Sequence, residues 1–351
     1  MNVIKYLYDK GLTNLGGHHW MADNIHYLTM MGSVAYGVNT DTSDCDVYGF
    51  CIPPKEDLFP HLKGEVVGFG NAKHANNRFS NFQQHHIQDV DADKEYDLNV
   101  YNIVDYFQLV MENNPNMIDS LFTPQFCVLH STKVGQMVRE KRKMFLHRGS
   151  WHTFKGYAFA QMKKMKVPEV RHCPRCQASP TLNKFDQLHD GKYCCKCVAD
   201  GELIEPVMKK VNRKIGKRAA KVEEDGYDLK FAYHIVRLLN EVEQIMTEGD
   251  IDLQRNREQL KAIRRGEWTL EQIEQYFHKK EVELETLYNE NKANLSWGPQ
   301  EDGLQDRIKQ LLFQCLEEHY GSLEKCVVNP DAAVMALREM GDVLNKYRKL
   351  L

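Results

Sequence analysis

The 351-residue sequence lacks several features that mark particular protein classes. It has no run of ~18 apolar residues, so we expect no transmembrane helix and no membrane partner. Its start, MNVIKYLYDKG, has no basic region followed by an apolar one, so we expect no secretory signal and a cytoplasmic location. Proline is sparse, with 11 residues, and no low-complexity tract or internal repeat occurs, while 42% of the residues are hydrophobic. This composition predicts a folded chain with a buried core.

The sequence also lacks a strong overall charge, since the formal net charge is −3. Its charges are nevertheless unevenly spread: between residues 133 and 230, lysine and arginine outnumber aspartate and glutamate about two to one, and the rest of the chain is acidic. A basic middle is compatible with a polyanionic substrate such as RNA. A solvated helical surface would produce the same bias.

The ten cysteines do not suggest a disulfide framework, because six are scattered and four form two close pairs. Cys173 and Cys176, with Cys194 and Cys197, give a C-x₂-C…C-x₂-C pattern, for which Cys195 would have the wrong spacing. This spacing predicts one structural Zn²⁺ held by four thiolates. The alternative is a redox role, which two matched pairs argue against. We expect a zinc-ribbon insert over residues 168–206, which could contact nucleic acid or brace a neighbouring domain.

The apolar and turn patterns predict a small set of strands followed by helices. Strands are expected at 26–31, 45–52 and 97–101, and residues 55–94 read as a long loop containing one hairpin. Helices are expected at about 103–113, 150–166 and 226–248 and through the C-terminal third. Residues 269–272, TLEQ, have the spacing of a capping box at a helix start.

The strongest functional signal is Gly32-Ser33 followed by Asp44 and Asp46 and, on a further expected strand, Asp97. Side chains at positions i and i+2 of a strand share a face, so Asp44 and Asp46 would repel each other unless a cation lies between them. Mg²⁺ takes carboxylate oxygens and substrate phosphates as ligands, and Ser33 at a strand end could hold a terminal phosphate. The alternative is an ordinary surface turn, because Asp-x-Asp pairs are common.

The segment GSVAYGVNTDTSDCDVYGFCIPP, residues 32–54, resembles the core of the DNA polymerase β nucleotidyltransferase superfamily. It is most similar to the RNA repair pathway DNA polymerase beta family, whose chains read GSxAYG…SDxDxxG…PP. The resemblance continues through NNPN and IDSL at 113–121, GYA at 156–158, GYDLKFAYHIVRLL at 226–239 and IRRGEWTLEQI from Ile263. It covers residues 27–275 apart from the cysteine insert, which the family pattern does not require.

The resemblance implies an α+β fold, in which a small mixed-sheet core precedes a mainly helical region, and a two-Mg²⁺ mechanism. It makes Asp44, Asp46 and Asp97 the metal-binding catalytic acids and assigns Gly32 and Ser33 to the triphosphate. Three other acids compete with Asp97 for the third position, although they precede the apolar alternation: Asp89, Asp91 and Asp93.

A basic stripe on the expected helix 226–248 provides a second candidate site. Lys230, His234 and Arg237 fall at i, i+4 and i+7, which places them on one helical face. Alone, this stripe suggests a salt-bridged surface helix; with the resemblance, it suggests nucleotide phosphate ligands. His234 could instead be a buried structural histidine.

Together these features predict a metal-dependent nucleotidyltransferase that moves an NMP from an NTP such as ATP to an acceptor hydroxyl, with a tRNA-like RNA 3′ end as the first choice. The alternatives are a protein-modifying adenylyltransferase and a non-catalytic zinc-ribbon RNA-binding protein with a vestigial acidic site. The expected parts are a catalytic core at 1–130, a helical substrate-binding region at 131–167 and 207–275, the insert at 168–206 and a helical region at 276–351. The sequence does not reveal the transferred base or the oligomeric state.

Overall fold

A computed structural model describes residues 2–39, 44–58, 79–165, 169–173, 207–210, 226–301 and 303–321, together with 175, 201, 204, 222 and 340. The chain divides into two compact units. The first contains residues 1–156, 238–259 and 280–351, and the second contains residues 157–237 and 260–279.

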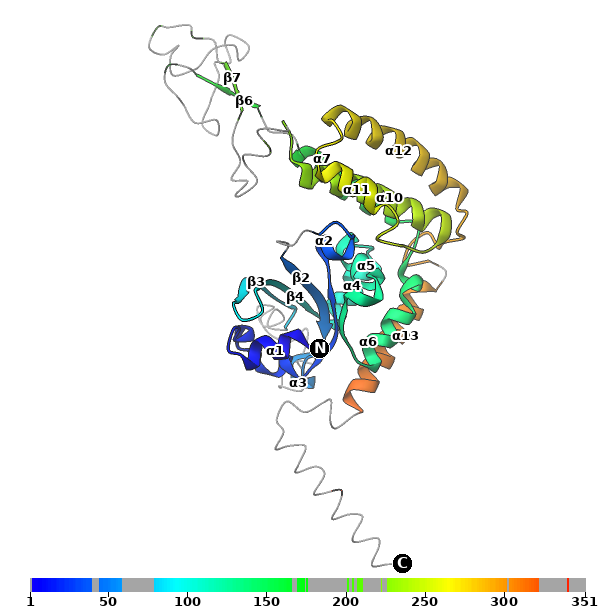
Figure 1. Ribbon diagram of the computed structural model, residues 1–351. Coiled ribbons are helices and arrows are strands. Elements are labelled where there is room, and N and C mark those ends of the chain that lie inside the picture. The colour runs from blue at the N-terminus through cyan, green and yellow to red at the C-terminus, as the bar shows by residue number, and fades with distance from the viewer. Residues whose placement is uncertain are drawn as a thin grey trace, which may run out of the picture. The chain divides into compact units, whose positions relative to one another are not determined.

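The first unit is built on a five-stranded mixed sheet (Figure 1). Its strands, in chain order, are β1 (Ile25–Met30), β2 (Cys45–Cys51), β3 (Asn81–Asp89), β4 (Lys94–Asn102) and β5 (Val128–Ser131). They lie side by side in the order β3-β4-β2-β1-β5. Only β2 and β4 run parallel; the other neighbouring pairs are antiparallel. The α+β fold and the three strands expected from sequence are therefore confirmed. Within residues 55–94, where a long loop with one hairpin was expected, the structure has the nine-residue strand β3, which pairs with the expected strand β4 instead of with a second strand of that segment.

Helices cover both faces of this sheet, with α1 (Val3–Asp9) on one side and α4 (Ile103–Met111) and α5 (Pro115–Phe122) on the other (Figure 1). On the α1 side, Val47 and Leu98 are fully buried with Ile4 in one apolar cluster. Burying such side chains contributes about 1.5–3 kcal/mol each, which makes this cluster a main source of stability. On the other side the Phe50 ring lies 4.9 Å from that of Tyr106.

Side-chain caps explain where several helices begin. Asn102 accepts a hydrogen bond from the Val104 N–H at the start of α4, and Asn114 caps α5, which has proline in its first turn. Thr269 and Gln272 exchange hydrogen bonds of 3.2 and 2.7 Å at the start of α12 (Leu270–Glu290). The capping box expected from sequence is thus confirmed.

The remaining helices follow in chain order. They are α2 (Gly32–Ala35), α3 (Lys55–Leu58), α6 (Lys133–Glu140), α7 (Ser150–Met165), α10 (Leu229–Glu248), α11 (Arg257–Arg264) and α13 (Leu304–Tyr320). Short 3₁₀ turns cover Leu15–Gly17, His19–Ala22, Gln125–Cys127 and Arg142–Phe145. Two further strands, β6 (Glu169–His172) and β7 (Val207–Lys210), pair antiparallel. Within the described part of the chain, no helix combines the length and apolar character needed to cross a bilayer.

The last described helix, α13, is tied to the strands at the other end of the chain. His26 on β1 lies 2.9 Å (Nε2 to Nδ1) from His319, and both imidazoles are buried. The Tyr320 hydroxyl donates to the Pro53 carbonyl, just beyond β2. The sheet core therefore includes contributions from both ends of the described chain.

Candidate active site

The parallel pairing of β2 and β4 brings two of the predicted acids together. Asp46 and Asp97 are register partners, and neighbouring strands lie about 4.8 Å apart. Because partners in register point to the same face, both side chains emerge on the face that carries α4 and α5. The Asp97 side chain is 21% exposed. Asp44 is exposed and lies just before β2, two residues from Asp46.

The Gly32 turn packs directly on Asp46. Gly32 has φ +62°, and a Cβ at this position would lie 2.1 Å from Asp46 Oδ2. The Met31 N–H donates to the Asp46 carbonyl at 2.7 Å, which fixes the end of β1 against the start of β2. Glycine is required here both by the left-handed backbone and by this approach. The structure thus brings Gly32 against Asp46, and Ser33 follows it in α2.

Two contacts that sequence analysis did not assign support this turn. The Tyr36 hydroxyl donates to Asp119 Oδ2 at 2.8 Å, and Asp119, on α5, is fully buried. The Gln254 side-chain amide donates to the backbone carbonyls of Val34 and Ala35. Tyr36 and Asp119 lay inside motifs that resembled the family, but nothing local in the sequence indicates that they meet.

A β-bulge holds the carboxylate of Asp97. The β3–β4 register slips between Gln84 and Ile87, so that His85 and His86 both lie opposite Asp97. The His86 backbone N–H donates to Asp97 Oδ1 at 2.8 Å, and His85 Nδ1 lies 3.3 Å from Asp97 Oδ2. A hydrogen bond with Glu95 and the charge of Asp97 raise the pKa of His86.

The bulge contributes to a group of potential metal ligands. One donor atom each from His86, Glu95 and Asp97 lies within 4.8 Å of the other two. Asp44 and Asp46 are not members of this group. Sequence analysis missed His86 and Glu95; the signal was the His-His pair in a polar segment that precedes an expected strand.

The acids that competed with Asp97 in the sequence occupy other places. Asp89 is buried, accepts a hydrogen bond from the Tyr6 hydroxyl at 2.8 Å and lies 3.1 Å from Lys10 Nζ. The Tyr6 hydrogen bond and Lys10 lower the pKa of Asp89. Asp91 is exposed and also pairs with Lys10. These acids connect the β3–β4 hairpin to α1.

Cys45, which lies between Asp44 and Asp46, packs against the apolar cluster on the α1 side of the sheet. Burial raises the pKa of its thiol to about 11. The thiol is therefore uncharged near neutral pH. The two acids, not the cysteine between them, carry the charge at this end of β2.

The basic stripe lies on the part of α10 that belongs to the second unit. Most apolar residues of α10 are buried. Lys230 is exposed and His234 is partly buried, with its ring 4.2 Å from that of Tyr233. Arg237 is only 4% exposed. The three cations thus differ in exposure, from exposed Lys230 to buried Arg237, and their assignment to nucleotide phosphates stays a prediction.

The zinc prediction falls mainly outside the described residues. Cys173 is buried and directly follows β6, whereas Cys176, Cys194 and Cys197 are not among the residues that the structure describes. The pairing of His172 with Val207 brings the two ends of the cysteine-bearing segment together. The segment between these residues therefore begins and ends at one antiparallel strand pair.

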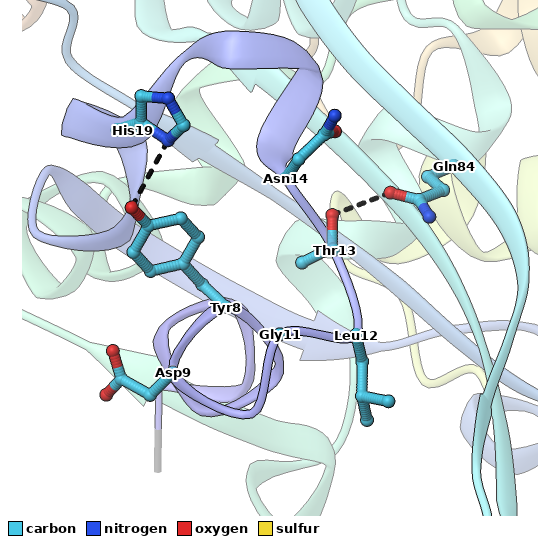
Figure 2. Close-up of a pocket in the computed structure, with 8 residues that line it drawn as sticks. All are labelled: Tyr8, Asp9, Gly11, Leu12, Thr13, Asn14, His19 and Gln84. Carbon is cyan, nitrogen blue, oxygen red and sulfur yellow. Dashed lines mark hydrogen bonds between the residues drawn. The ribbon is translucent and has the colours of Figure 1, made fainter.

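A polar pocket of about 750 Å³ lies at the N-terminal segment and contains none of the predicted site residues. Figure 2 shows the Tyr8 hydroxyl facing His19 Nδ1 at 3.2 Å and the Thr13 hydroxyl donating to Gln84 at 2.6 Å. Gln84 pairs with Leu98, whose side chain is buried on the α1 side. The pocket is therefore on the opposite face of the sheet from Asp46 and Asp97.

In a comparison with known protein families, the RNA repair pathway DNA polymerase beta family matches residues 12–307. No curated protein and no solved structure was found to match the chain. The matched range contains the Gly32 turn, all three acids and the basic stripe. With most of its length matched, the chain belongs to the RNA repair pathway DNA polymerase beta family, the polymerase beta-like nucleotidyltransferases of RNA repair.

Proposed function

We propose that the chain transfers a nucleoside monophosphate from an NTP to the 3′ hydroxyl of an RNA, with a tRNA-like end as the first candidate. One observation carries this proposal: Asp46 and Asp97 are register partners on parallel strands, and the Gly32 turn packs on Asp46. An acidic pair beside a tight glycine turn has the chemistry that a metal–triphosphate substrate requires.

The donor set fits divalent ions. Asp44, Asp46 and Asp97 offer only carboxylate oxygens, which are the ligands that Mg²⁺ prefers, and like charges on neighbouring strands favour a bound cation. These residues would hold two Mg²⁺. When bound, such ions neutralise phosphate charge and make a hydroxyl more acidic.

The chain's own residues would then orient the reactants. Gly32 and Ser33 would hold the triphosphate, because the turn leaves room for close approach only while position 32 has no side chain. Asp97 would accept the proton of the attacking hydroxyl. That oxygen forms a bond to the α-phosphorus while the bond to the leaving pyrophosphate breaks.

The basic stripe would bind phosphates of the NTP or of the RNA. Lys230 is the most accessible of the three cations, since it is exposed at the start of α10. Arg237 is the most buried, and a buried guanidinium that met a phosphate bidentately would contribute more than an exposed one. His234 would contribute to the same phosphate-binding face as Lys230 and Arg237.

We also propose that the four predicted cysteines hold one Zn²⁺. Two C-x₂-C pairs are the donor set of a closed tetrahedral site, and the β6–β7 pairing brings the ends of this segment together. A closed site leaves no position for substrate. Zinc would therefore stabilise this part of the chain and take no part in the transfer reaction.

A labelling experiment tests the proposal. The purified protein is incubated with Mg²⁺ and each α-labelled NTP, with and without total RNA, and the labelled molecule is identified. We expect RNA to be labelled by wild type and by Asp91→Asn, an exposed acid of the β3–β4 turn. We expect no labelling by Asp44→Ala combined with Asp46→Ala.

Other outcomes would favour the alternatives. Label on protein instead of RNA would indicate an adenylyltransferase that modifies proteins. RNA binding that is weakened by Cys173→Ser, with no labelling under any condition, would indicate a non-catalytic RNA-binding protein. Labelling that survives loss of both Asp44 and Asp46 would refute the assigned site.

A further inference from the structure

The β3–β4 edge places a mixed set of metal-binding atoms beside the acidic site. His86 comes from the bulge of β3, and Glu95 and Asp97 come from β4, two residues apart and therefore on one face. One donor atom of each lies within 4.8 Å of the other two. His86 has φ 58°, and this left-handed conformation belongs to the bulge that sets it opposite Asp97.

Each carboxylate of this set is oriented by a hydrogen bond from outside the set or from the backbone. Gln88 Nε2 donates to Glu95 Oε2 at 2.6 Å, which leaves Oε1 facing His86 Nδ1. The His86 backbone N–H donates to Asp97 Oδ1. Hydrogen bonds of this kind orient the ligands in protein metal sites.

The distances and exposure suit an ion that enters from solvent. An octahedral ion with ligands at ~2.1 Å needs its donor atoms ~3–4 Å apart. The most widely spaced donors of this set would therefore close, whereas His86 Nδ1 and Glu95 Oε1, which are hydrogen-bonded, would move apart to admit the ion. The side chain of Glu95 is 23% exposed and that of His86 is 77% exposed, so an ion can reach the site and His86 can rotate onto it.

The chemistry of the donors selects the kind of ion. One imidazole nitrogen with two carboxylates suits Mn²⁺, Fe²⁺ or Zn²⁺, whereas Mg²⁺ prefers oxygen ligands and its own waters. Two carboxylate charges in one set also favour a dication over a neutral ligand.

We propose that His86, Glu95 and Asp97 form a binding site for a transition-metal dication at the edge of the sheet. The inference goes beyond the proposed function, since the site shares only Asp97 with the proposed Mg²⁺ ligands. His85 is not a ligand; its Nδ1 lies against the second oxygen of Asp97 and keeps that carboxylate in place.

Mn²⁺ alone is the probe for this site, because thiolates bind it poorly and the predicted cysteine site will not compete. The full chain is freed of metal and carries Asp44→Asn and Asp46→Asn, which remove the other proposed ions. We expect electron paramagnetic resonance to show one bound Mn²⁺ coupled to an imidazole ¹⁴N nucleus.

Matched variants in that background identify the ligands. His86→Ala should abolish the ¹⁴N coupling and raise the Mn²⁺ dissociation constant by about tenfold or more. Glu95→Gln should raise the dissociation constant while preserving the coupling. His85→Ala should retain both the coupling and the affinity. Thermal unfolding of each variant shows whether it is folded, and Glu95→Gln serves as the test if His86→Ala is not.

Two results would overturn the inference: no nitrogen coupling at all, or a coupling that His85→Ala removes and His86→Ala preserves. The test is independent of nucleotidyl transfer. If His86→Ala loses Mn²⁺ binding but wild type fails to label RNA, only the proposed function is refuted. If wild type labels RNA but binds no nitrogen-coupled Mn²⁺, only this site is refuted.

Discussion

Replacing Gly32 by alanine should separate the stability of the chain from its activity. A residue with a side chain at φ +62° costs about 1–2 kcal/mol relative to an ordinary conformation. The added Cβ would start 2.1 Å from Asp46 Oδ2, so this oxygen has to move by about 1 Å or more. Because a carboxylate end can rotate, we expect this movement to add little to the loss of stability.

The same displacement should strongly reduce catalysis. A misplacement of about 1 Å at a reacting group can lower the rate about 100-fold. We therefore expect Gly32→Ala to lower RNA labelling by about that factor, while its free energy of unfolding falls by only about 1–2 kcal/mol. Urea unfolding and the labelling rate measure the two effects.

Gly17→Ala is the matched control. Gly17 has φ +85°, and a Cβ there meets nothing within 4 Å, so the variant has the backbone cost without the contact. We expect it to lose similar stability and to keep its activity. If Gly32→Ala labels RNA as fast as Gly17→Ala, the position of Asp46 does not matter for the reaction and the reasoning fails.

Three further predictions follow from contacts elsewhere in the chain. Gly49→Ala should prevent folding or cost several kcal/mol, because its Cβ would lie 1.9 Å from the Tyr27 carbonyl oxygen; wild-type stability in urea would contradict this close approach. Thr269→Ala should lower stability by about 1 kcal/mol by removing the cap that Gln272 reciprocates, whereas Thr269→Ser should restore it. Burial lowers the pKa of His147 below 6.5, so the unfolded chain binds more protons there and stability falls as the pH drops through that value. His147→Gln should weaken this decline between about pH 7.5 and about pH 5.5 in urea unfolding, and an unchanged decline would exclude His147 as a source.

The elements that sequence predicts well are those whose signals are local. A short apolar run identified β1, and alternating apolar residues identified β2. Asn102, Asn114 and Thr269 cap helices where side chains of their type usually do. These patterns depend on a few neighbouring residues. Local physical chemistry is therefore sufficient to place them.

The parts that sequence missed depend on pairing between distant segments. The bulge at His85 and His86 exists only because β3 pairs with β4 in a particular register, and a polar segment looks like a loop until that partner is known. The burial of Arg237 likewise depends on what packs around α10, which helical periodicity alone does not reveal. The acids were predictable as candidates, but the neighbours of Asp97 were not.

The link between β1 and α13 has a consequence for biosynthesis. A ribosome releases residues 25–53 long before it makes residue 319. Until then, His26 and the Pro53 carbonyl lack their hydrogen-bond partners at the end of α13. A nascent chain at that stage carries an unfinished core, and a fragment that stops before Leu304 never completes it. Such fragments should recruit chaperones or aggregate during translation, whereas extensions added after α13 leave this closing step intact.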